Sequence, residues 1–363
     1  MKIFNIRPTG LNVGNSLIHL SLARLIELAA DSRTSILSIP ASSRDSRKIS
    51  SGLSSSSIYE INGSGDGLII GGGNLFENNE LTIDFNALEK ISVPNCIFSV
   101  SYGRVFNKNK KLIERTDCMP DEYLIKLCSS INRVGCRDEA TFIKLKELGC
   151  KNIDIVGCPT IHISRFFSKS FFQNLSLSLD DKNRCLISIR SISLISIPFS
   201  EKNKISKLLL HAIQMVKKKG LIPTILCHDR RDIEYAESLC DNQIEFIVEE
   251  DVYRYLALVV NARLLITLRL HSFIPRMSYE LPGINIIYDE RALSLSKFYG
   301  LEKYCINALE NDSFKNLDKL IDYSLDESSK EEIKQISKSN NWLNNYNLQI
   351  NFIRDFLLNK NFV

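Results

Sequence analysis

Two cationic side chains, Arg269 and His271, stand two residues apart at the end of the apolar run "ITLRLHSFIP" (266–275). The run predicts a buried strand over 263–270, and residues i and i+2 of a strand point to the same face. Two cations on one face are costly in an apolar core but suit a pocket for an anion. Arg binds carboxylate or phosphate through paired hydrogen bonds. A His beside such an anion is stabilised in its cationic form and can act as an acid near neutral pH.

Three other predicted strands in this part of the chain also end in polar or charged residues. The strand over 184–190 ends in Arg190, the strand over 221–228 ends in His228, and the strand over 283–290 ends in "YDE", which includes Asp289. Ligands of open parallel sheets bind outside the carboxyl ends of the strands. A polar loop alone explains any one of these residues, but four strands that deliver such groups to one edge favour a binding site.

The first part of the chain offers a less charged counterpart in "GGGNLFE" (71–77) and "SYG" (101–103), which both follow predicted strands. Glycines allow a ligand to approach backbone N–H groups, and a helix starting there would add its positive end. A tight turn is the other interpretation, because the chain has neither G-x-G-x-x-G nor a Walker lysine. The candidate residues of this side are Gly71, Gly72, Gly73, Asn74, Ser101 and Gly103.

Short β-rich runs alternate with helix-length segments along most of the chain. This order predicts an α/β protein with parallel sheets and helices on both faces. At 363 residues the chain is expected to form two domains. We expect two Rossmann-like domains facing across a cleft, over 1–165 and 184–327, joined by a linker at 166–183 and followed by a helical tail at 328–363. The Ser-rich segment 42–57 is expected to be a surface loop.

Composition narrows the class of partner. The net charge of +4 is small for this length and does not favour nucleic acid. The chain has ten cysteines without a C-x-x-C, and its acidic residues are dispersed, so no metal site is expected. The start of the chain lacks a signal-peptide pattern and no apolar run reaches a membrane span, which predicts a cytoplasmic protein. The basic segment 108–111 leaves peripheral contact with the inner face of the plasma membrane open.

Several short motifs occur in the order typical of the polysaccharide pyruvyl transferase family, which the chain resembles over roughly residues 1–305. These motifs are "GGGNLF", "SYG", "GCRDEATFIKLKELG", "VGCPT", "ISIR", "HDRRD", "LITLRLHSFIP" and "IIYDER". The resemblance implies a GT-B-like fold. It also implies transfer of a pyruvyl group from phosphoenolpyruvate, as co-substrate and without another cofactor, to sugar hydroxyls of a cell-surface glycan or its precursor, usually as a cyclic ketal.

The implied chemistry assigns roles to the residues at the strand ends. The methylene carbon of phosphoenolpyruvate must be protonated, and His271 is the expected general acid. Arg269 and Arg190 are expected to bind its phosphate and carboxylate, with His228 as a further phosphate ligand. Asp289 would orient a cation or accept a sugar proton. The glycine-rich side of the first domain would line the acceptor.

Some features leave alternatives open. The family often has acidic residues where this chain has Asn15 and Cys158, and many members have a lysine near Arg291. A GT-B glycosyltransferase that uses a nucleotide sugar would share the fold and the basic edge. A non-catalytic relative that binds glycan or scaffolds a complex is a second alternative. The sequence does not decide whether the acceptor is a lipid-linked oligosaccharide, nucleotide-linked or polymeric, and it leaves the oligomeric state unknown.

Overall fold

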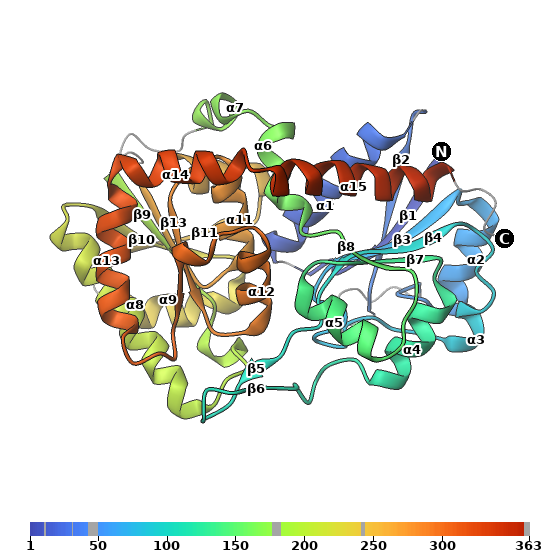
Figure 1. Cartoon of the computed structure of the whole chain (residues 1–363), viewed down its shortest axis with the longest axis horizontal. Coiled ribbons are helices and arrows are strands. Elements are labelled where there is room, and N and C mark those ends of the chain that lie inside the picture. The colour runs from blue at the N-terminus through green and yellow to red at the C-terminus, as the bar shows by residue number, and fades with distance from the viewer. Residues whose placement is uncertain (11, 31, 43–49, 176–182, 241–243, 359–363) are drawn as a thin grey trace.

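The computed structural model describes residues 1–10, 12–30, 32–42, 50–175, 183–240 and 244–358. Two six-stranded parallel sheets, one in each half of the chain, lie side by side with helices on both faces (Figure 1). The first sheet has the order β2 (Ser35–Pro40), β1 (Lys2–Arg7), β3 (Gly67–Gly73), β4 (Asn95–Val100), β7 (Arg133–Cys136) and β8 (Ile153–Ile155). The second has the order β11 (Glu245–Val248), β10 (Ile222–Cys227), β9 (Arg184–Ser188), β12 (Leu264–Thr267), β13 (Gly283–Ile287) and β14 (Cys305–Asn307). The predicted fold class is confirmed.

Helices connect and cover the strands. Those of the first half are α1 (Val13–Ala29), α2 (Ser55–Ser64), α3 (Phe85–Leu88), α4 (Asp121–Ser130) and α5 (Glu139–Glu147). The short helices α6 (Ile163–Phe166) and α7 (Lys169–Gln173) lead to the second half. There the helices are α8 (Phe199–Lys218), α9 (Ile233–Leu239), α10 (Val252–Asn261), α11 (Leu270–Ser278), α12 (Glu290–Phe298), α13 (Ser313–Leu325), α14 (Glu327–Ser337) and α15 (Asn340–Leu358). No helix of these described segments is both long and apolar enough to cross a bilayer.

The burial of the central strands in both sheets follows from their apolar local sequence. The central strands β3, β4, β9 and β12 are buried at every position, as expected for strands of a parallel sheet covered on both faces. In each sheet the chain order reverses beside the first strand, next to β1 and next to β9. Such reversals open a crevice at the carboxyl ends of the strands, where ligands of doubly wound sheets bind.

Several elements tie the halves together. Helix α15 runs back across the junction to the first half (Figure 1), where Phe352 packs against Phe98 of β4 with ring centroids 5.6 Å apart. A hairpin of β5 (Val105–Phe106) and β6 (Leu112–Ile113) leaves the first half, and Phe106 packs into the core of the second. At its base, Arg104 makes hydrogen bonds of 2.5–3.0 Å to Glu290.

The structure corrects some local predictions. The strand predicted over 263–270 ends at Thr267, and His271 lies in the first turn of α11 instead of on a strand. No helix begins after the three glycines, because residues 74–79 form a bend and turns. Within 42–57, the part described is not a surface loop: Leu53 is fully buried and α2 begins at Ser55, while 43–49 lie outside the described residues. Part of the predicted linker, 176–182, also lies outside them.

Candidate functional site

A pocket lies between the two halves, at the carboxyl edges of both sheets. The residues lining it are Asn12, Asn15, Asn74, Arg137, Arg190, His228, Leu268, Arg269, Leu270, His271, Tyr288, Asp289, Arg291 and Ala292. A second pocket shares Asn12, Asn15, Asn74, Arg190 and Arg269 with it and extends past Asn78, Glu80 and Arg231. All five residues predicted on the second half therefore meet in one place. Of the six predicted on the first half, only Asn74 lines either pocket.

The three glycines have packing reasons for their identity. A Cβ at Gly71 would overlap the carbonyl oxygen of Phe98, and one at Gly72 would overlap Ile18 Cγ2 of α1. Gly72 and Gly73 also have φ of +85° and +94°, which side chains rarely adopt. These glycines let the strand, its neighbour and α1 pack closely, and that packing brings Asn74 to the pocket.

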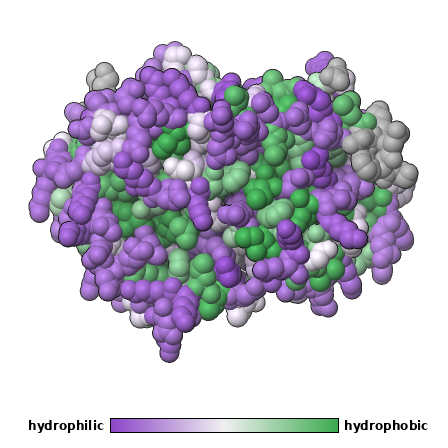
Figure 2. All heavy atoms as spheres, in the orientation of Figure 1, coloured by the Kyte–Doolittle hydropathy of each residue, from purple (hydrophilic) through white to green (hydrophobic). Residues whose placement is uncertain are grey.

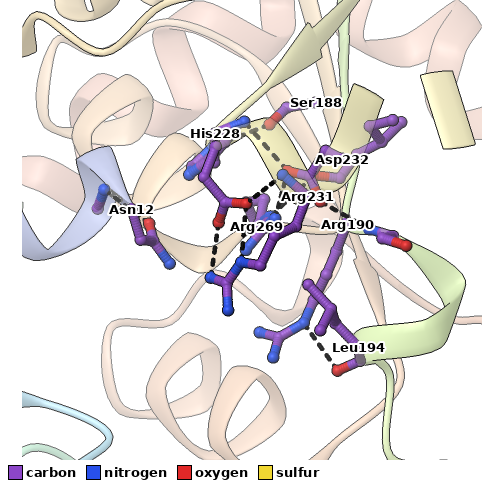
Figure 3. Close-up of polar contacts among 12 residues, drawn as sticks. Asn12, Ser188, Arg190, Leu194, His228, Arg231, Asp232 and Arg269 are labelled. Atoms are coloured by element: carbon purple, nitrogen blue, oxygen red, sulfur yellow. Dashed lines mark hydrogen bonds and ion pairs between the residues drawn. The ribbon is translucent and has the colours of Figure 1, made fainter. Parts of the chain in front are cut away.

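Arg269 is held by the second half itself (Figure 3). Its Nε donates to the carbonyl of Ile189 at 2.8 Å, and its Nη2 forms an ion pair with the fully buried Asp232. The same carboxylate accepts the N–H of Ser191 at 2.8 Å and the N–H of His228 at 3.2 Å. Asp232 therefore neutralises Arg269 and fixes three strand ends relative to one another.

His228 sits in a buried hydroxyl network. Its Nε2 hydrogen bonds with Ser188 at 3.0 Å, Ser272 at 2.8 Å and Tyr255 at 2.6 Å. Burial, and then the charge of nearby Arg269, hold the pKa of His228 well below its ordinary value. The imidazole is accordingly neutral at physiological pH and anchored by its neighbours.

His271 differs from His228 because its Nε2 is buried and has no hydrogen-bond partner within the described part of the chain. Burial, and then the charges of Arg137, Arg291 and Arg269, hold its pKa well below the ordinary value. Helix α1 can approach the ring because of Gly14, where a Cβ would lie 3.0 Å from His271 Nδ1. The site thus holds a neutral histidine among cations, with one ring nitrogen free to meet a ligand.

Asp289 and Arg291 form a second neutralised pair. Asp289 caps α12 by accepting the N–H of Ala292 at 3.1 Å, and its other oxygen lies 2.5 Å from Arg291 Nη2. Burial opposes ionisation of Asp289, but Arg291 and the helix N–H keep its pKa below the usual value. Arg291 also lies 2.6 Å from the buried Glu77 of the first half, and its side chain passes over Gly103, where a Cβ would lie 2.5 Å away.

Arg137 and Arg190 are the pocket arginines without an acidic partner among the residues described. Arg137 follows β7, is almost completely buried, and donates from Nε to Ser101 Oγ at 2.6 Å, while its Nη2 is buried without a partner. Ser101 in turn donates to Asp138 at 2.7 Å. Arg190 donates from Nε to the carbonyl of Leu194 at 3.0 Å (Figure 3). These two guanidinium groups, one from each half, carry charge that is available to an anion.

Arg137 is a site residue that the sequence prediction omits, although the signal for it is present. In "RVGCRDE" (133–139), Arg137 directly follows a short run with the pattern of a strand, and Arg190 and Arg269 stand near the ends of similar runs. The prediction weighs charged strand ends in the second half, but mainly glycines in the first. It also omits Asn12, whose side chain caps α1 by accepting the N–H of Gly14 at 2.9 Å. With Asn15 and Asn74, Asn12 gives the first half a wall of neutral amides.

The part of the chain that is described contains no group of three or more His, Cys, Asp or Glu placed to hold a metal ion.

Comparisons with known proteins bear on the family and the fold of the chain. The family model of polysaccharide pyruvyl transferase matches residues 12–290. Among solved structures, MnaA from S. aureus with UDP aligns with a TM-score of 0.61 at 13% identity, covering 98% of this chain and 96% of that one. The Methanocaldococcus jannaschii UDP-GlcNAc 2-epimerase gives 0.56 at 14%, covering 93% and 99%. The wall teichoic acid polymerase TagF gives 0.51 at 10%, covering 98% and 88%. These likenesses show a shared GT-B fold. A search of curated proteins gave no match.

Proposed function

The chain belongs to the polysaccharide pyruvyl transferase family, and from this premise we propose that it transfers a pyruvyl group from phosphoenolpyruvate to hydroxyls of a cell-surface glycan or its precursor. One observation carries the proposal most directly. Within the described residues, Arg137 and Arg190 bring charge without acidic partners to a pocket that also holds His271 with an unpartnered Nε2. A small ligand with two anionic groups and a carbon that needs a proton suits this set.

The arginines are proposed to act in two classes. Arg137 and Arg190 bind the phosphate and carboxylate of phosphoenolpyruvate by charge-assisted hydrogen bonds. Arg269 and Arg291 are positioned by Asp232 and Asp289, so they add donors in fixed places with less net charge. Asp289 is therefore assigned to the first of its two predicted roles, orienting a cation. Its ion pair with Arg291 makes it a poor base.

His271 is proposed to become an acid only when the donor is bound. In the free protein, burial and the surrounding arginines keep its pKa low. A bound anion offsets those cations and raises the pKa, so binding brings a proton to the ring. The imidazolium then gives this proton to the methylene carbon, which becomes the methyl group of the pyruvyl unit. The oxygen that joins C2 to phosphate stabilises the resulting positive charge on C2 until a nucleophile attacks.

Two hydroxyls of the acceptor complete the reaction. The first attacks C2 and gives its proton back to His271. The C2–O bond to phosphate then breaks, the second hydroxyl attacks the same carbon, and its proton leaves with inorganic phosphate. The products are a cyclic ketal and phosphate. The amide wall of Asn12, Asn15 and Asn74 is proposed to bind the acceptor, because neutral amides donate to and accept from sugar hydroxyls.

Calorimetric titration tests this proposal directly. We expect phosphoenolpyruvate to bind the wild type, to bind Arg137→Ala and Arg190→Ala more weakly, and to retain affinity for His271→Ala. Arg33→Ala, an exposed change outside both pockets, is the matched control. Binding of UDP-sugars in place of phosphoenolpyruvate would contradict the proposal and favour a nucleotide-sugar glycosyltransferase. Phosphoenolpyruvate binding without turnover across a wide range of glycans would favour the non-catalytic alternative.

A further inference from the structure

A basic surface stands beside the pocket, formed by the β5–β6 hairpin and the start of α8. We call it the hairpin surface. It comprises Lys108, Lys110, Lys111, Ile113, Phe199, Lys202 and Lys204. The hairpin forms a hydrophilic projection at the lower edge of the molecule in Figure 2, at the place where Figure 1 shows β5 and β6. The projection belongs neither to the pocket walls nor to a core.

The lysines of the hairpin surface are not neutralised within the described structure. None of the five forms an ion pair there. Lys110 Nζ donates to the Asn311 side chain at 2.8 Å, and Lys204 Nζ donates to the Glu310 carbonyl at 2.5 Å. The pKa of Lys204 is lowered by burial and then by the charge of Lys110, so these cations lie close enough to repel one another. Glu201 and Glu310 are the acidic groups that face Lys204, and they leave an excess of positive charge.

Apolar side chains accompany these charges. Phe199 is 78% exposed at the first position of α8, and Ile113 is 45% exposed at the end of β6. Their neighbours are anchored, since Phe106 and Leu112 of the hairpin and Ile195 before α8 pack together in the second-half core. The two exposed side chains are therefore held out by a rigid base. Lysines interspersed with an exposed aromatic residue are the pattern of segments that bind the interface of an anionic bilayer.

The hairpin surface is continuous with the rim of the pocket. The chain runs from Arg190 and Leu194, which line the second pocket, directly to Phe199. On the other side, Val105 of β5 bridges to Asp289. The hairpin surface therefore lies close to residues that line both pockets.

We propose that the hairpin surface docks the protein on an anionic lipid bilayer. The phosphate headgroups meet the lysines, and Phe199 and Ile113 enter the interfacial region. This docking presents the pocket to acceptor sugars carried on lipid, a consequence that rests on the proposed function. Docking on the bilayer does not rest on the proposed function, so vesicle binding can be tested independently of the reaction.

Vesicle sedimentation tests the proposal with the full chain. The probes are vesicles of phosphatidylcholine alone and of phosphatidylcholine mixed with phosphatidylglycerol. We expect binding only to the mixed vesicles, and loss of that binding at high salt. Replacing the three hairpin lysines (Lys108→Gln, Lys110→Asn, Lys111→Gln) should weaken it on the order of a hundredfold, since each lysine contributes roughly fivefold. Asn is chosen at position 110 because φ there is +59°.

Controls separate docking from other effects. The matched triple Lys90→Gln, Lys151→Gln, Lys338→Gln removes exposed lysines elsewhere and should leave vesicle binding unchanged. Phe199→Ser should weaken binding several-fold without changing net charge. Unaltered phosphoenolpyruvate affinity in the hairpin triple shows that the pocket is intact. The proposal would be overturned by an equal loss of vesicle binding in both triple variants or by binding without preference for the anionic vesicles. Binding to heparin or RNA without binding to vesicles would also overturn it.

Discussion

The two walls of the pocket carry their charge in different ways. The second half brings Arg269 and Arg291 already paired with Asp232 and Asp289, and it anchors His228 in a hydroxyl network. The first half brings neutral asparagines and the buried Arg137, whose Nη2 has no hydrogen-bond partner in the part of the chain that the structure describes. Arg269 and Arg291 are neutralised without a ligand, whereas Arg137 from the first half and Arg190 from the second have no acidic partner among the residues described. From this contrast we expect the neutralised arginines to hold the site in place and the unpaired ones to supply binding strength.

The largest effect on turnover should come from His271, which is proposed neither to hold other groups in place nor to supply binding strength. Replacing His271 by Gln removes the proposed proton donor but keeps a polar side chain of similar size, so turnover should fall about 10²–10⁴-fold. Phosphoenolpyruvate affinity should stay within a few-fold. Phosphate release in the presence of a glycan panel, together with calorimetry, measures both. His211→Gln, at a surface histidine paired with Asp318, is the control. Equal losses of affinity and turnover in His271→Gln would argue for a binding role instead.

Arg269→Ala should act mainly on stability. It leaves Asp232 charged and buried without a cation, which typically costs about 3–5 kcal/mol of unfolding free energy. Denaturant unfolding measures this cost. Adding Asp232→Asn should recover part of the loss, because the buried charge is then gone. A single variant as stable as the wild type would show that Asp232 has another partner.

Arg137→Ala should behave in the opposite way. No carboxylate is left unpaired, so the unfolding free energy should change little, while loss of charged hydrogen bonds to the ligand costs about 1.5–3 kcal/mol, roughly 10–100-fold in phosphoenolpyruvate affinity. Ser101→Ala, which frees Arg137 Nε, should give a smaller loss. Strong destabilisation by Arg137→Ala without loss of affinity would break the comparison between the two walls.

Lowering the pH should reduce the stability of the protein through its buried, neutral histidines. His271, His228 and His162 have lowered pKa values in the folded protein, about 3 for His162 because of burial. The unfolded chain therefore binds more protons, and stability falls as pH drops below about 6.5, by about 1.4 kcal/mol per pH unit for each histidine kept neutral. Thermal unfolding between pH 7.5 and 5.5 measures this loss. Phosphoenolpyruvate should reverse the His271 share, and calorimetry in buffers of different ionisation heat should detect proton uptake that His271→Gln lacks.

The smallest effect on stability and activity taken together is expected from Arg104, which pairs with Glu290 where the two halves meet. Arg104 is 46% exposed, whereas the side chain of its partner Glu290 is only 9% exposed. Because Glu290 keeps its hydrogen bond from the Arg104 N–H, Arg104→Ala should cost on the order of 1–2 kcal/mol of stability. Its readout is the Michaelis constant for phosphoenolpyruvate, which should rise slightly because the pair holds the halves together. A large drop in turnover would mean that Arg104 positions catalytic groups.

Much of this arrangement follows from the residues themselves. Parallel strands place their ends at one edge, so the order of strands and polar residues along the chain is enough to group Arg190, His228, Arg269 and His271. In "GCRDEATFIKLKELG", an Asp just before a helical pattern is a typical N-cap, and Asp138 does accept the N–H of Thr141 at 2.9 Å. Hydrophobic period and helix caps are local properties, which is why these predictions succeed.

Properties set by distant contacts could not be predicted. The strand-end pattern predicts Arg269 as a free anion ligand, but Asp232 neutralises it from 37 residues away in the sequence. Gly71 and Gly72 resemble a ligand loop, but their environment is Phe98 and Ile18. The α12 helix and the β5–β6 hairpin escape prediction because each is short and gains its stability from the other half. Sequence pattern places side chains at an edge, and only tertiary packing shows which charges remain uncompensated.

Helix α15 has a consequence for how the molecule is made. Phe352, Ile353 and Phe356 belong to the same apolar cluster as Ile3 and Leu22 of the first half. During synthesis, the ribosome releases the first sheet long before this last helix. The apolar face of the first sheet therefore stays exposed until α15 has been synthesised and packs against it. Premature termination within α15 should consequently yield a protein whose second half is sound and whose first half is prone to aggregate.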